Sequence, residues 1–253
     1  YLSKIPGTNN YNISSVSDMK KMLPFASFPY YKFKQTSDIN LASETEFYIP
    51  ILKSEYNGNG HSISHLEITY YNNDNLGMFG TIYVGGSVVN VSIINSQVSG
   101  NDLIGGLSGY NQGVILNCST AGNTIGIDSV GGLVGFNSAT IQNCYATGDM
   151  SGGWYVGGLV GFNRDKVNNS YATGEVIGDY EVGGLVGLSD SEGSIRNCYA
   201  TGNVTGVLNL GGLVGFVTHG SIKNCYATGN VIGDFVIGGL VGFVTYGSIT
   251  NCY

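Results

Sequence analysis

Two short phrases recur along the chain at a nearly constant interval, and this repetition limits the possible folds more than any other feature. Asn-Cys-Tyr begins at Asn143, Asn197, Asn224 and Asn251. Gly-Gly-Leu-Val-Gly begins at Gly131, Gly157, Gly183, Gly211 and Gly238. Self-similarity at a period of 25 to 28 residues indicates one structural unit stacked on copies of itself. The sequence therefore predicts one elongated repeat domain.

Each repeat contains three pieces that resemble strands: Gly-Leu-Val-Gly-Phe, Ile-x-Asn-Cys-Tyr-Ala-Thr and a short Asn-Val-x-Gly. The 41 glycines of the 253 residues are too many for a helical protein, and they fall at fixed repeat positions. A unit of this length suits three strands per coil of a parallel β-helix, which the crossover rule makes right-handed. With strands ~4.8 Å apart, eight or nine coils give a rod of roughly 40 Å.

The region before the repeats has a different pattern. Over residues 13–23, apolar residues recur at helical spacing, and Ser15 precedes Asp18 by three positions, as in a capping box. We predict a short amphipathic helix here, ended by Pro24, that caps the open end of the solenoid.

The predicted organisation is an N-terminal cap followed by one solenoid. The cap spans 1–30 and the parallel β-helix 31–253, with divergent opening coils at 31–74 and regular repeats at 75–253. The chain ends in mid-strand at Tyr253, and a bare strand edge invites aggregation. We therefore expect the sequence to be a fragment of a longer protein.

The repeats predict which side chains face inward. The strand Ile63–Thr69 alternates like Ile222–Thr228, with Leu66 matched to Cys225 and Ile68 to Ala227. Positions that hold Ile, Leu or Val early and Cys or Ala later must face the core. The five cysteines, an odd number without metal-site spacing, then form a column of small buried thiols. Within Gly-Leu-Val-Gly we expect Leu, rather than Val, to face inward.

One column of mostly asparagine residues precedes the cysteines, and Asp38 and His65 extend it toward the N-terminus. Alternation breaks at this column, which indicates a corner where asparagine tolerates left-handed backbone. We predict that each amide bonds the amide of the next coil, as a structural ladder. Its members are Asn90, Asn117, Asn143, Asn169, Asn197, Asn224 and Asn251.

Charge and hydropathy exclude several partners. Residues 54–253 contain four basic and thirteen acidic residues, a net charge of −9. Such a surface repels phosphate, so we expect no nucleic-acid or anionic-membrane partner. No run of 18 apolar residues exists that would span a bilayer.

The Gly-Gly-Leu-Val-Gly and Asn-Cys-Tyr-Ala-Thr-Gly motifs resemble GLUG repeats over about residues 75–253. These repeats occur in large secreted or surface-anchored microbial proteins, including adhesins and the non-catalytic regions of IgA-specific metallopeptidases. The resemblance implies an extracellular, cell-surface or secreted β-solenoid. The zinc motif of those peptidases, His-Glu-x-x-His, is absent from this sequence.

An outward column of tyrosines with a parallel column of threonines is the first candidate binding surface. It could stack sugar rings or contact a partner protein, or it could serve as a cross-coil ladder that only stabilises the sheet. The tyrosines are Tyr145, Tyr171, Tyr199, Tyr226 and Tyr253, and the threonines are Thr147, Thr173, Thr201 and Thr228.

Acidic side chains are the second candidate, because β-helix enzymes that act on polysaccharides use clustered carboxylates as acid, base or calcium ligands. Asp179 and Asp234 occupy equivalent positions two coils apart, and Asp149 and Glu175 are adjacent in one column. No basic residue stacks with them to stabilise a developing anion. No calcium motif accompanies them, so we expect no catalytic residue, no bound metal and no cofactor.

We therefore expect a non-enzymatic, adhesin-like β-helix. Its partner would be a surface protein or glycan of a host or neighbouring cell, bound through an exposed sheet or the variable corners. The alternatives are a polysaccharide-degrading β-helix enzyme and a passive stalk or spacer. The sequence leaves the oligomeric state open.

Overall fold

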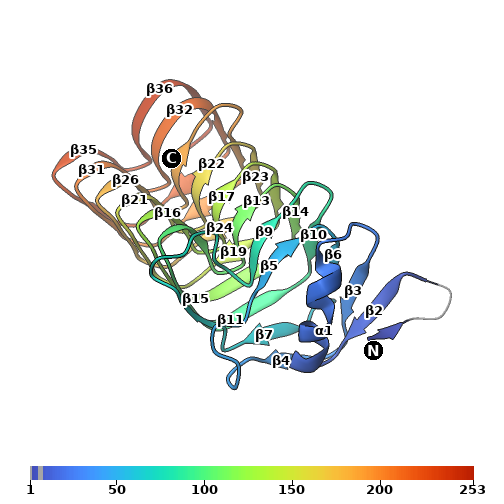
Figure 1. Ribbon diagram of the computed structural model, residues 1–253. Coiled ribbons are helices and arrows are strands. Elements are labelled where there is room, and N and C mark those ends of the chain that lie inside the picture. Colours follow the sequence, from blue (N-terminus) through green and yellow to red (C-terminus); the bar gives the residue numbers. More distant parts are fainter. Residues whose placement is uncertain (1, 5–7) are drawn as a thin grey trace.

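The protein is an elongated β-solenoid of about eight coils, shown by a computed structural model that describes residues 2–4 and 8–253. Successive coils lie side by side from the N-terminal helix to the C-terminal strands (Figure 1). The described strands form three sheets, and their pairings are parallel except for the β1–β2 pair. The predicted all-β parallel solenoid with a short N-terminal helix is confirmed.

The three sheets are here named A, B and C. Sheet A contains 17 strands: β1 (Ser3–Lys4), β2 (Asn10–Ile13), β3 (Lys32–Gln35), β5 (Ile49–Leu52), β6 (Glu55–Asn57), β9 (Phe79–Ile82), β10 (Ser87–Val89), β13 (Ser108–Asn111), β14 (Val114–Leu116), β17 (Val134–Asn137), β18 (Thr140–Gln142), β22 (Val160–Asn163), β23 (Lys166–Asn168), β27 (Val186–Ser189), β28 (Ser194–Arg196), β32 (Val214–Lys223) and β36 (Val241–Thr250).

Sheet B contains 13 strands: β4 (Ile39–Asn40), β7 (Ser62–Ser64), β8 (Glu67–Thr69), β11 (Ser92–Ser99), β15 (Ser119–Ile125), β19 (Tyr145–Ala146), β20 (Met150–Ser151), β24 (Tyr171–Ala172), β25 (Val176–Ile177), β29 (Tyr199–Ala200), β30 (Val204–Thr205), β33 (Tyr226–Ala227) and β34 (Val231–Ile232). Sheet C contains six: β12 (Asp102–Gly105), β16 (Asp128–Gly131), β21 (Trp154–Gly157), β26 (Tyr180–Gly183), β31 (Leu208–Gly211) and β35 (Phe235–Gly238).

The helix α1 (Val16–Ala26) lies at the N-terminal end of the solenoid, beside its first coils (Figure 1). Ser15 is its N-cap: the hydroxyl accepts from the backbone N–H of Asp18. The helix buries Met19 and Met22 in the main core. The prediction that it ends at Pro24 is wrong, because the helix continues through this residue to Ala26. The predicted cap range, 1–30, includes residues 1 and 5–7, which lie outside the described part of the chain.

The coils between Val130 and Leu210 enclose two separate apolar cores, whereas the opening coils share one. The larger lies between sheet A and the first strands of sheet B, and the smaller lies between sheet C and the second strands of sheet B. The smaller core contains Val130, Met150, Val156, Val176, Val182, Val204 and Leu210. The coil therefore has a narrow waist, where sheet B approaches the Gly-Gly pair of the opposite wall.

The waist explains the repeated glycines and alanines. A Cβ on Gly158 would overlap the carbonyl oxygen of Gly184 and lie 2.8 Å from the Cβ of Ala172. Gly132 meets Ala146 in the same way, and Gly184 meets Ala200. Larger side chains at either position would separate the two walls of the coil. Glycine is therefore fixed here by close approach rather than by turn geometry.

The order of strands within a coil differs in detail from the prediction. Sheet C, formed by the residues just before Gly-Gly, was not expected as a separate strand. Both Leu159 and Val160 are fully buried, so the expectation that only the leucine faces inward is wrong. The cause is the corner between sheets C and A, at which consecutive residues both point into the core.

The strand register of the opening coils shows that Ile68 does not occupy the column of Ala227, as the sequence comparison had predicted. Ile63 pairs with Ile93, whereas Ile68 pairs with Val98. Ile68 therefore lies in the column that leads to Met150, and the column of Ala146 begins with Ile39 and Ile63. Strict apolar alternation fits either register, so the sequence match of Ile68 to Ala227 could not discriminate between them.

The cysteines form the expected column of free thiols. Cys118, Cys144, Cys198 and Cys225 are buried, and Cys252 is partly exposed. The backbone N–H of Cys198 donates to the Sγ of Cys225 at 3.4 Å, and the Cys198 thiol donates to the carbonyl of Arg196 at 3.1 Å. Burial raises the pKa of the Cys198 thiol, which keeps it protonated.

Candidate functional site

The tyrosine column lies on the outer face of sheet B, over the C-terminal coils. Strand register places Tyr145, Tyr171, Tyr199 and Tyr226 directly above one another, and Tyr253 stacks on Tyr226. Neighbouring rings are parallel within 3° to 8°, with centroids 4.7 to 5.4 Å apart. The column is therefore one continuous aromatic stack along the solenoid axis.

This geometry determines which atoms the tyrosines present to solvent. Each inner ring has both faces covered by its neighbours, so the stack exposes ring edges and phenol hydroxyls. Burial and the neighbouring rings raise the pKa of Tyr171 and Tyr199, which keeps these phenols protonated at neutral pH. Stacking of a sugar ring on the inner tyrosine faces would require the column to open.

The hydroxyls of this surface form no hydrogen bond with the residues that the structure describes. Within the described chain, neither the tyrosine nor the threonine hydroxyls of the two columns have a partner. The threonines Thr147, Thr173, Thr201 and Thr228 are all exposed. Hydroxyls both donate and accept, and strands in adjacent coils are ~4.8 Å apart. The outer face of sheet B thus presents two parallel rows of unpaired polar groups.

The asparagine column lies at the corner before this face. Asn90 through Asn251 adopt left-handed backbone with φ of 49° to 55°, and each side-chain amide donates to the side-chain carbonyl one coil earlier. The donor–acceptor distances are 2.9 to 3.2 Å along the six pairs from Asn117 to Asn251. Each inner amide thus donates one hydrogen bond and accepts one along the column, which forms the predicted ladder between coils.

His65 and Asp38 do not belong to this column. His65 has left-handed backbone, but the pairing of Ser64 with Ile94 places it beside Asn95. Asp38 instead accepts from the backbone N–H of Ser62 at 2.8 Å and lies 3.5 Å from Nδ1 of His61. The near-constant spacing of Asp38, His65 and Asn90 in the sequence suggested one column, but the two earlier residues lie at other positions of the coil.

A second asparagine ladder, fully buried, was missed by the sequence reasoning. Asn111 donates to Asn137, and Asn137 donates to Asn163, both at 2.8 Å. All three are at 0% exposure. The only sequence signal is the asparagine that ends Gly-Phe-Asn in two repeats and Gly-Tyr-Asn in a third. The later coils replace it with Ser189 and Val217.

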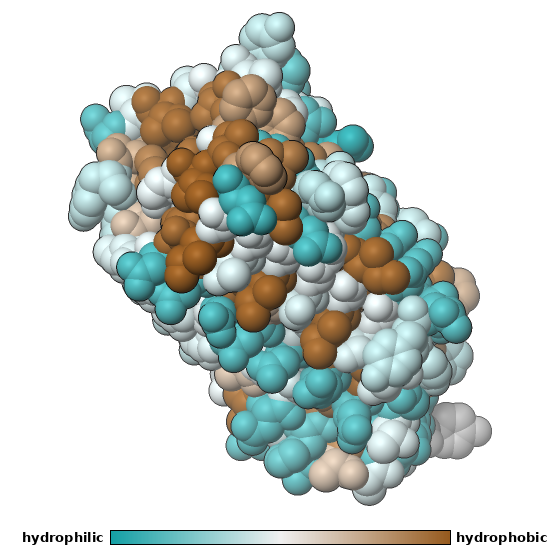
Figure 2. Space-filling view, turned by 90° about the vertical axis from the view of Figure 1, so that its left-hand side faces the viewer, coloured by the Kyte–Doolittle hydropathy of each residue, from teal (hydrophilic) through white to brown (hydrophobic). Residues whose placement is uncertain are grey.

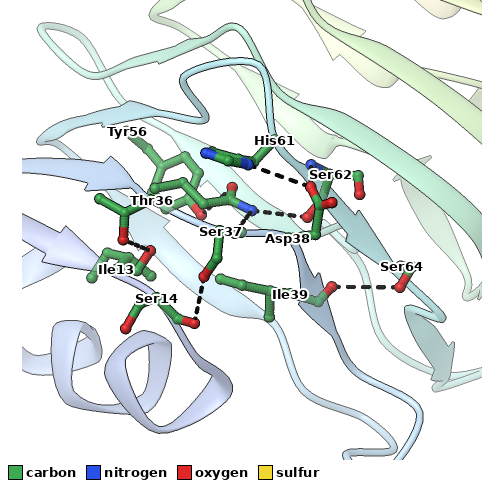
Figure 3. A network of polar contacts seen from close by, with 11 residues as sticks. Ile13, Ser14, Thr36, Ser37, Asp38, Ile39, Tyr56, His61, Ser62 and Ser64 are labelled. Atoms are coloured by element: carbon green, nitrogen blue, oxygen red, sulfur yellow. Dashed lines mark hydrogen bonds and ion pairs between the residues drawn. The ribbon is translucent and has the colours of Figure 1, made fainter.

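The opening coils satisfy their buried polar groups differently (Figure 3). Tyr56 is fully buried and donates to Gln35 at 3.0 Å, and Gln35 donates to the carbonyls of Ser37 and Ser62. Burial raises the pKa of Tyr56 far above its ordinary value. These groups are bonded to one another, so the network joins three segments of the opening coils.

The acidic candidates are not gathered into one site. Asp149 accepts from the backbone N–H of Glu175 at 2.9 Å on sheet B, and Val207 separates Asp179 from Asp234. Asp190 accepts from the hydroxyl of Thr218, which holds the pKa of its carboxyl below the ordinary value. Glu192 is exposed.

Among the described residues, no three or more His, Cys, Asp or Glu side chains converge on a point that could hold a metal ion. The same residues contain no helix of the length and apolar character needed to span a membrane.

Two cavities flank the C-terminal half of α1. One of about 430 Å³ is lined mainly by aromatic residues of the cap, and another of about 470 Å³ lies beside Pro50 and Tyr48. The first is lined by Leu2, Tyr11, Lys21, Pro24, Phe25, Tyr31 and Phe33. The dense aromatic sequence from Phe25 to Phe33 was a signal for this cluster that the sequence reasoning did not use.

Comparison with known proteins gives the same repeat boundaries as the strands. The GLUG motif matches residues 128–151, 152–177, 178–205, 206–232 and 233–253. Halomucin of Haloquadratum walsbyi is 34% identical over 132 residues, which cover 46% of this chain and 1% of Halomucin. The chain thus spans about one hundredth of that relative.

Two solved structures share the fold. A protein from Bacteroides ovatus, described as a candidate immunoglobulin A1 protease, superposes with a TM-score of 0.73 at 21% identity. That match covers 96% of this chain and 86% of the other. A protein described as IgA1 protease gives a TM-score of 0.69 at 20% identity, over 98% of this chain and 22% of the other. At these identities the likeness concerns the fold. With five consecutive GLUG motifs over residues 128–253, this chain belongs to the GLUG-repeat family.

Proposed function

We propose that this chain is a non-catalytic, adhesin-like segment of an extracellular microbial surface protein. It binds a polar ligand, a glycan or the surface of a partner protein, through the outer face of sheet B. The observation that carries this proposal is a row of five tyrosine hydroxyls beside a row of four threonine hydroxyls on consecutive coils, none of which has a partner in the described chain.

The rigidity of the surface supports this role. Strand register fixes the tyrosine row, whose rings are held by their neighbours at 4.7 to 5.4 Å. Backbone hydrogen bonds between coils fix the threonine row, as from the N–H of Thr173 to the carbonyl of Ala146 at 3.1 Å. Ordered hydroxyls lose little conformational entropy when they bind a ligand. Several weak hydrogen bonds formed in register then add to a useful affinity.

The comparisons support an extracellular surface protein in a more general way. GLUG repeats and the similarity to Halomucin are what a repetitive surface region would show. The separated carboxylates on the described coils favour a binding role over polysaccharide hydrolysis, which requires two carboxyl groups facing one substrate.

A passive spacer is the second candidate function, and the mutual coverage of the tyrosine rings favours it. Such a stack stabilises the sheet without any ligand. The two functions differ in what the hydroxyls do, because only a binding surface requires them.

The test is a glycan array with the wild-type chain and the double variant Tyr199→Phe/Tyr226→Phe. Phenylalanine keeps the ring stack and removes two hydroxyls, so we expect an unchanged midpoint of unfolding and affinity weakened about tenfold or more, equivalent to roughly 1.4 kcal/mol. Tyr71→Phe, at an exposed tyrosine outside the column, is the matched control. Absence of binding on the array and to intact cells, or equal binding by the double variant, would leave the spacer as the function.

A further inference from the structure

One outward column of sheet C changes in character along the solenoid. Its first three positions are carboxylates, and its last four are aromatic or apolar. Strand register places them one above another, in the order Asp74, Asp102, Asp128, Trp154, Tyr180, Leu208 and Phe235. Figure 2 faces this side of the molecule: hydrophobic residues gather toward the C-terminal end and hydrophilic residues toward the N-terminal end.

The three carboxylates have no basic partner among the described residues. Asp74 accepts from the Asn101 amide at 2.9 Å, and Asp128 accepts from the Ser129 hydroxyl at 2.6 Å. Burial, together with the charges of Asp128 and Asp74, raises the pKa of Asp102. All four basic residues of the repeat region lie elsewhere, at Arg164, Lys166, Arg196 and Lys223.

Glu181, in the adjoining outward column, adds charge to the same region. Its side chain is nine-tenths buried: Oε1 accepts from the Asn209 amide at 3.0 Å, and Oε2 has no hydrogen-bond partner in the described structure. Burial raises the pKa of Glu181, and the charge of Asp128 raises it further. Burial, together with the charges of Glu181 and Asp128, raises the pKa of Tyr155, which lies directly below Glu181. No basic side chain of the described residues forms an ion pair with these carboxylates.

Trp154 lies where the acidic part of the column meets the aromatic part. Its ring stacks on Tyr180 at 4.2 Å and 21°, which covers the face toward the C-terminal end. The opposite face is on the side of Asp128, the strand neighbour of Trp154. Trp154 is 43% exposed in the middle of the solenoid, and Ile127 beside Asp128 is 55% exposed. An indole face next to carboxylates is a strong attractor of cations.

We propose that this column is the docking surface for a basic, extended segment of a protein partner. An arginine of the partner lies on the open face of Trp154 with its guanidinium directed at Asp128, and a second basic residue pairs with Asp102 and Asp74. A guanidinium suits the site because it stacks on aromatic rings and binds carboxylates with two parallel hydrogen bonds.

The spacing and charge of the column favour this partner over a neutral glycan. Side chains on one face of an extended segment are ~6.7 Å apart, so two fit along the ~10 Å line of three stacked carboxylates. The carboxylates are aligned rather than convergent, which suits a row of positive charges. A neutral sugar could stack on Trp154 but would leave three carboxylates without a counter-charge.

The experiment uses the tryptophan fluorescence of the intact chain, since Trp154 is its only tryptophan. Titration with hexa-arginine should change the emission in a saturable way, and hexa-glutamate should not. Asp102→Asn/Asp128→Asn should weaken binding about tenfold, the effect of roughly 1.4 kcal/mol. For Trp154→Ala, binding is followed by anisotropy of a labelled peptide, and a similar loss is expected.

The matched control is Asp149→Asn/Glu175→Asn, which removes the same charge from two neighbouring carboxylates on sheet B. Equal weakening by this control would mean general charge attraction and would overturn the proposal. An unchanged emission on peptide binding, or displacement of the peptide by a neutral oligosaccharide, would also overturn it. Tyr199→Phe/Tyr226→Phe should leave this binding intact, so the result is separate from the hydroxyl surface of sheet B. Thermal unfolding of each variant verifies that it folds.

Discussion

The glycine and alanine columns at the waist and the columns on the surface of this solenoid repeat for different reasons. At the waist, Gly158 and Ala172 recur because the two walls of the coil leave no space for a larger side chain. On the outside, Asn169 and Tyr199 recur because each copy binds the copy in the next coil. Repetition at the waist thus reflects a limit on volume, whereas repetition in the surface columns, as in the buried asparagine ladder, reflects an attraction between identical groups.

The difference predicts how each column tolerates change. An interior column accepts a different residue if that residue is no larger and forms the same hydrogen bonds. Ser170 does so in the cysteine column, because its hydroxyl accepts from the backbone N–H of Cys144 at 3.1 Å. A surface column can end abruptly, as the tyrosines do at Ser119, the strand neighbour of Tyr145. Four predictions test this contrast.

The largest effect is expected at the waist. Gly158→Ala should destabilise the protein by about 3 kcal/mol, because its Cβ would overlap the backbone of Gly184 and press on Ala172. Gly239→Ala is the matched control: it occupies the same repeat position in the last coil, with nothing within 4 Å of its Cβ. Urea unfolding of both variants measures the difference. Equal stability of the two would show that the waist does not restrict volume.

The second effect compares the buried and exposed asparagine ladders. Asn163→Ala should cost about 2 kcal/mol, because it removes one of the two acceptors of the buried Asn137 amide and leaves one buried N–H unpaired; the other N–H still donates to the carbonyl of Ala139 at 2.8 Å. Asn169→Ala should cost about 1 kcal/mol, mainly from left-handed backbone at φ 49°, since water can replace its amide bonds. Asn169→Gly should recover most of that loss. A larger loss at Asn169 than at Asn163 would reverse the ranking of the two ladders.

The third effect concerns the tyrosine stack. Tyr199→Ala should destabilise by about 1 kcal/mol, since it removes two ring contacts at 4.7 and 5.0 Å. Tyr199→Phe should have no measurable effect on unfolding, because the hydroxyl has no partner in the described chain. A stability loss in the phenylalanine variant would mean that the hydroxyls also contribute to the fold.

The smallest effect is the pH dependence of the acidic column. The pKa values of Asp102 and Asp128 are raised in the folded protein, mainly by burial, so their ionisation opposes folding as the pH rises above the ordinary carboxyl value of 3.8. Asp102→Asn/Asp128→Asn should therefore be more stable than wild type at neutral pH, by less than about 1 kcal/mol. The two proteins should converge as the pH falls to that value.

Asp190→Asn should change the stability at neutral pH in the opposite direction. The Thr218 hydroxyl lowers the pKa of Asp190, so this carboxylate contributes stability above its unfolded pKa that is lost as the pH falls through the lowered folded value. The variant should be less stable than wild type at neutral pH. Thermal unfolding across the acid range measures both cases. The same sign in both variants would contradict the assigned causes.

Features that follow from the repeated residues themselves could be predicted from the sequence. Features that depend on which residues the folded coils bring together could not. The periods of Asn143 and Cys144 predicted the coil, the left-handed corner and the thiol column, because each follows from local backbone chemistry. The waist was missed because a Gly-Gly pair reads as a turn, and only the opposing Ala146 reveals the close contact. The acidic-to-aromatic column was missed because Asp128 and Trp154 have nothing in common until strand register aligns them.

The two cores on either side of the waist also determine how the rod deforms. A coil with two lobes joined at a narrow middle is broader in one direction than in the other, so its flexural stiffness differs between the two directions. Bending that compresses one lobe and stretches the other works against the full breadth of the strands, and bending across the thin direction works against much less. Under load such a rod bends mainly in the plane of its thin direction. The sheet faces that lie parallel to that plane therefore keep their orientation.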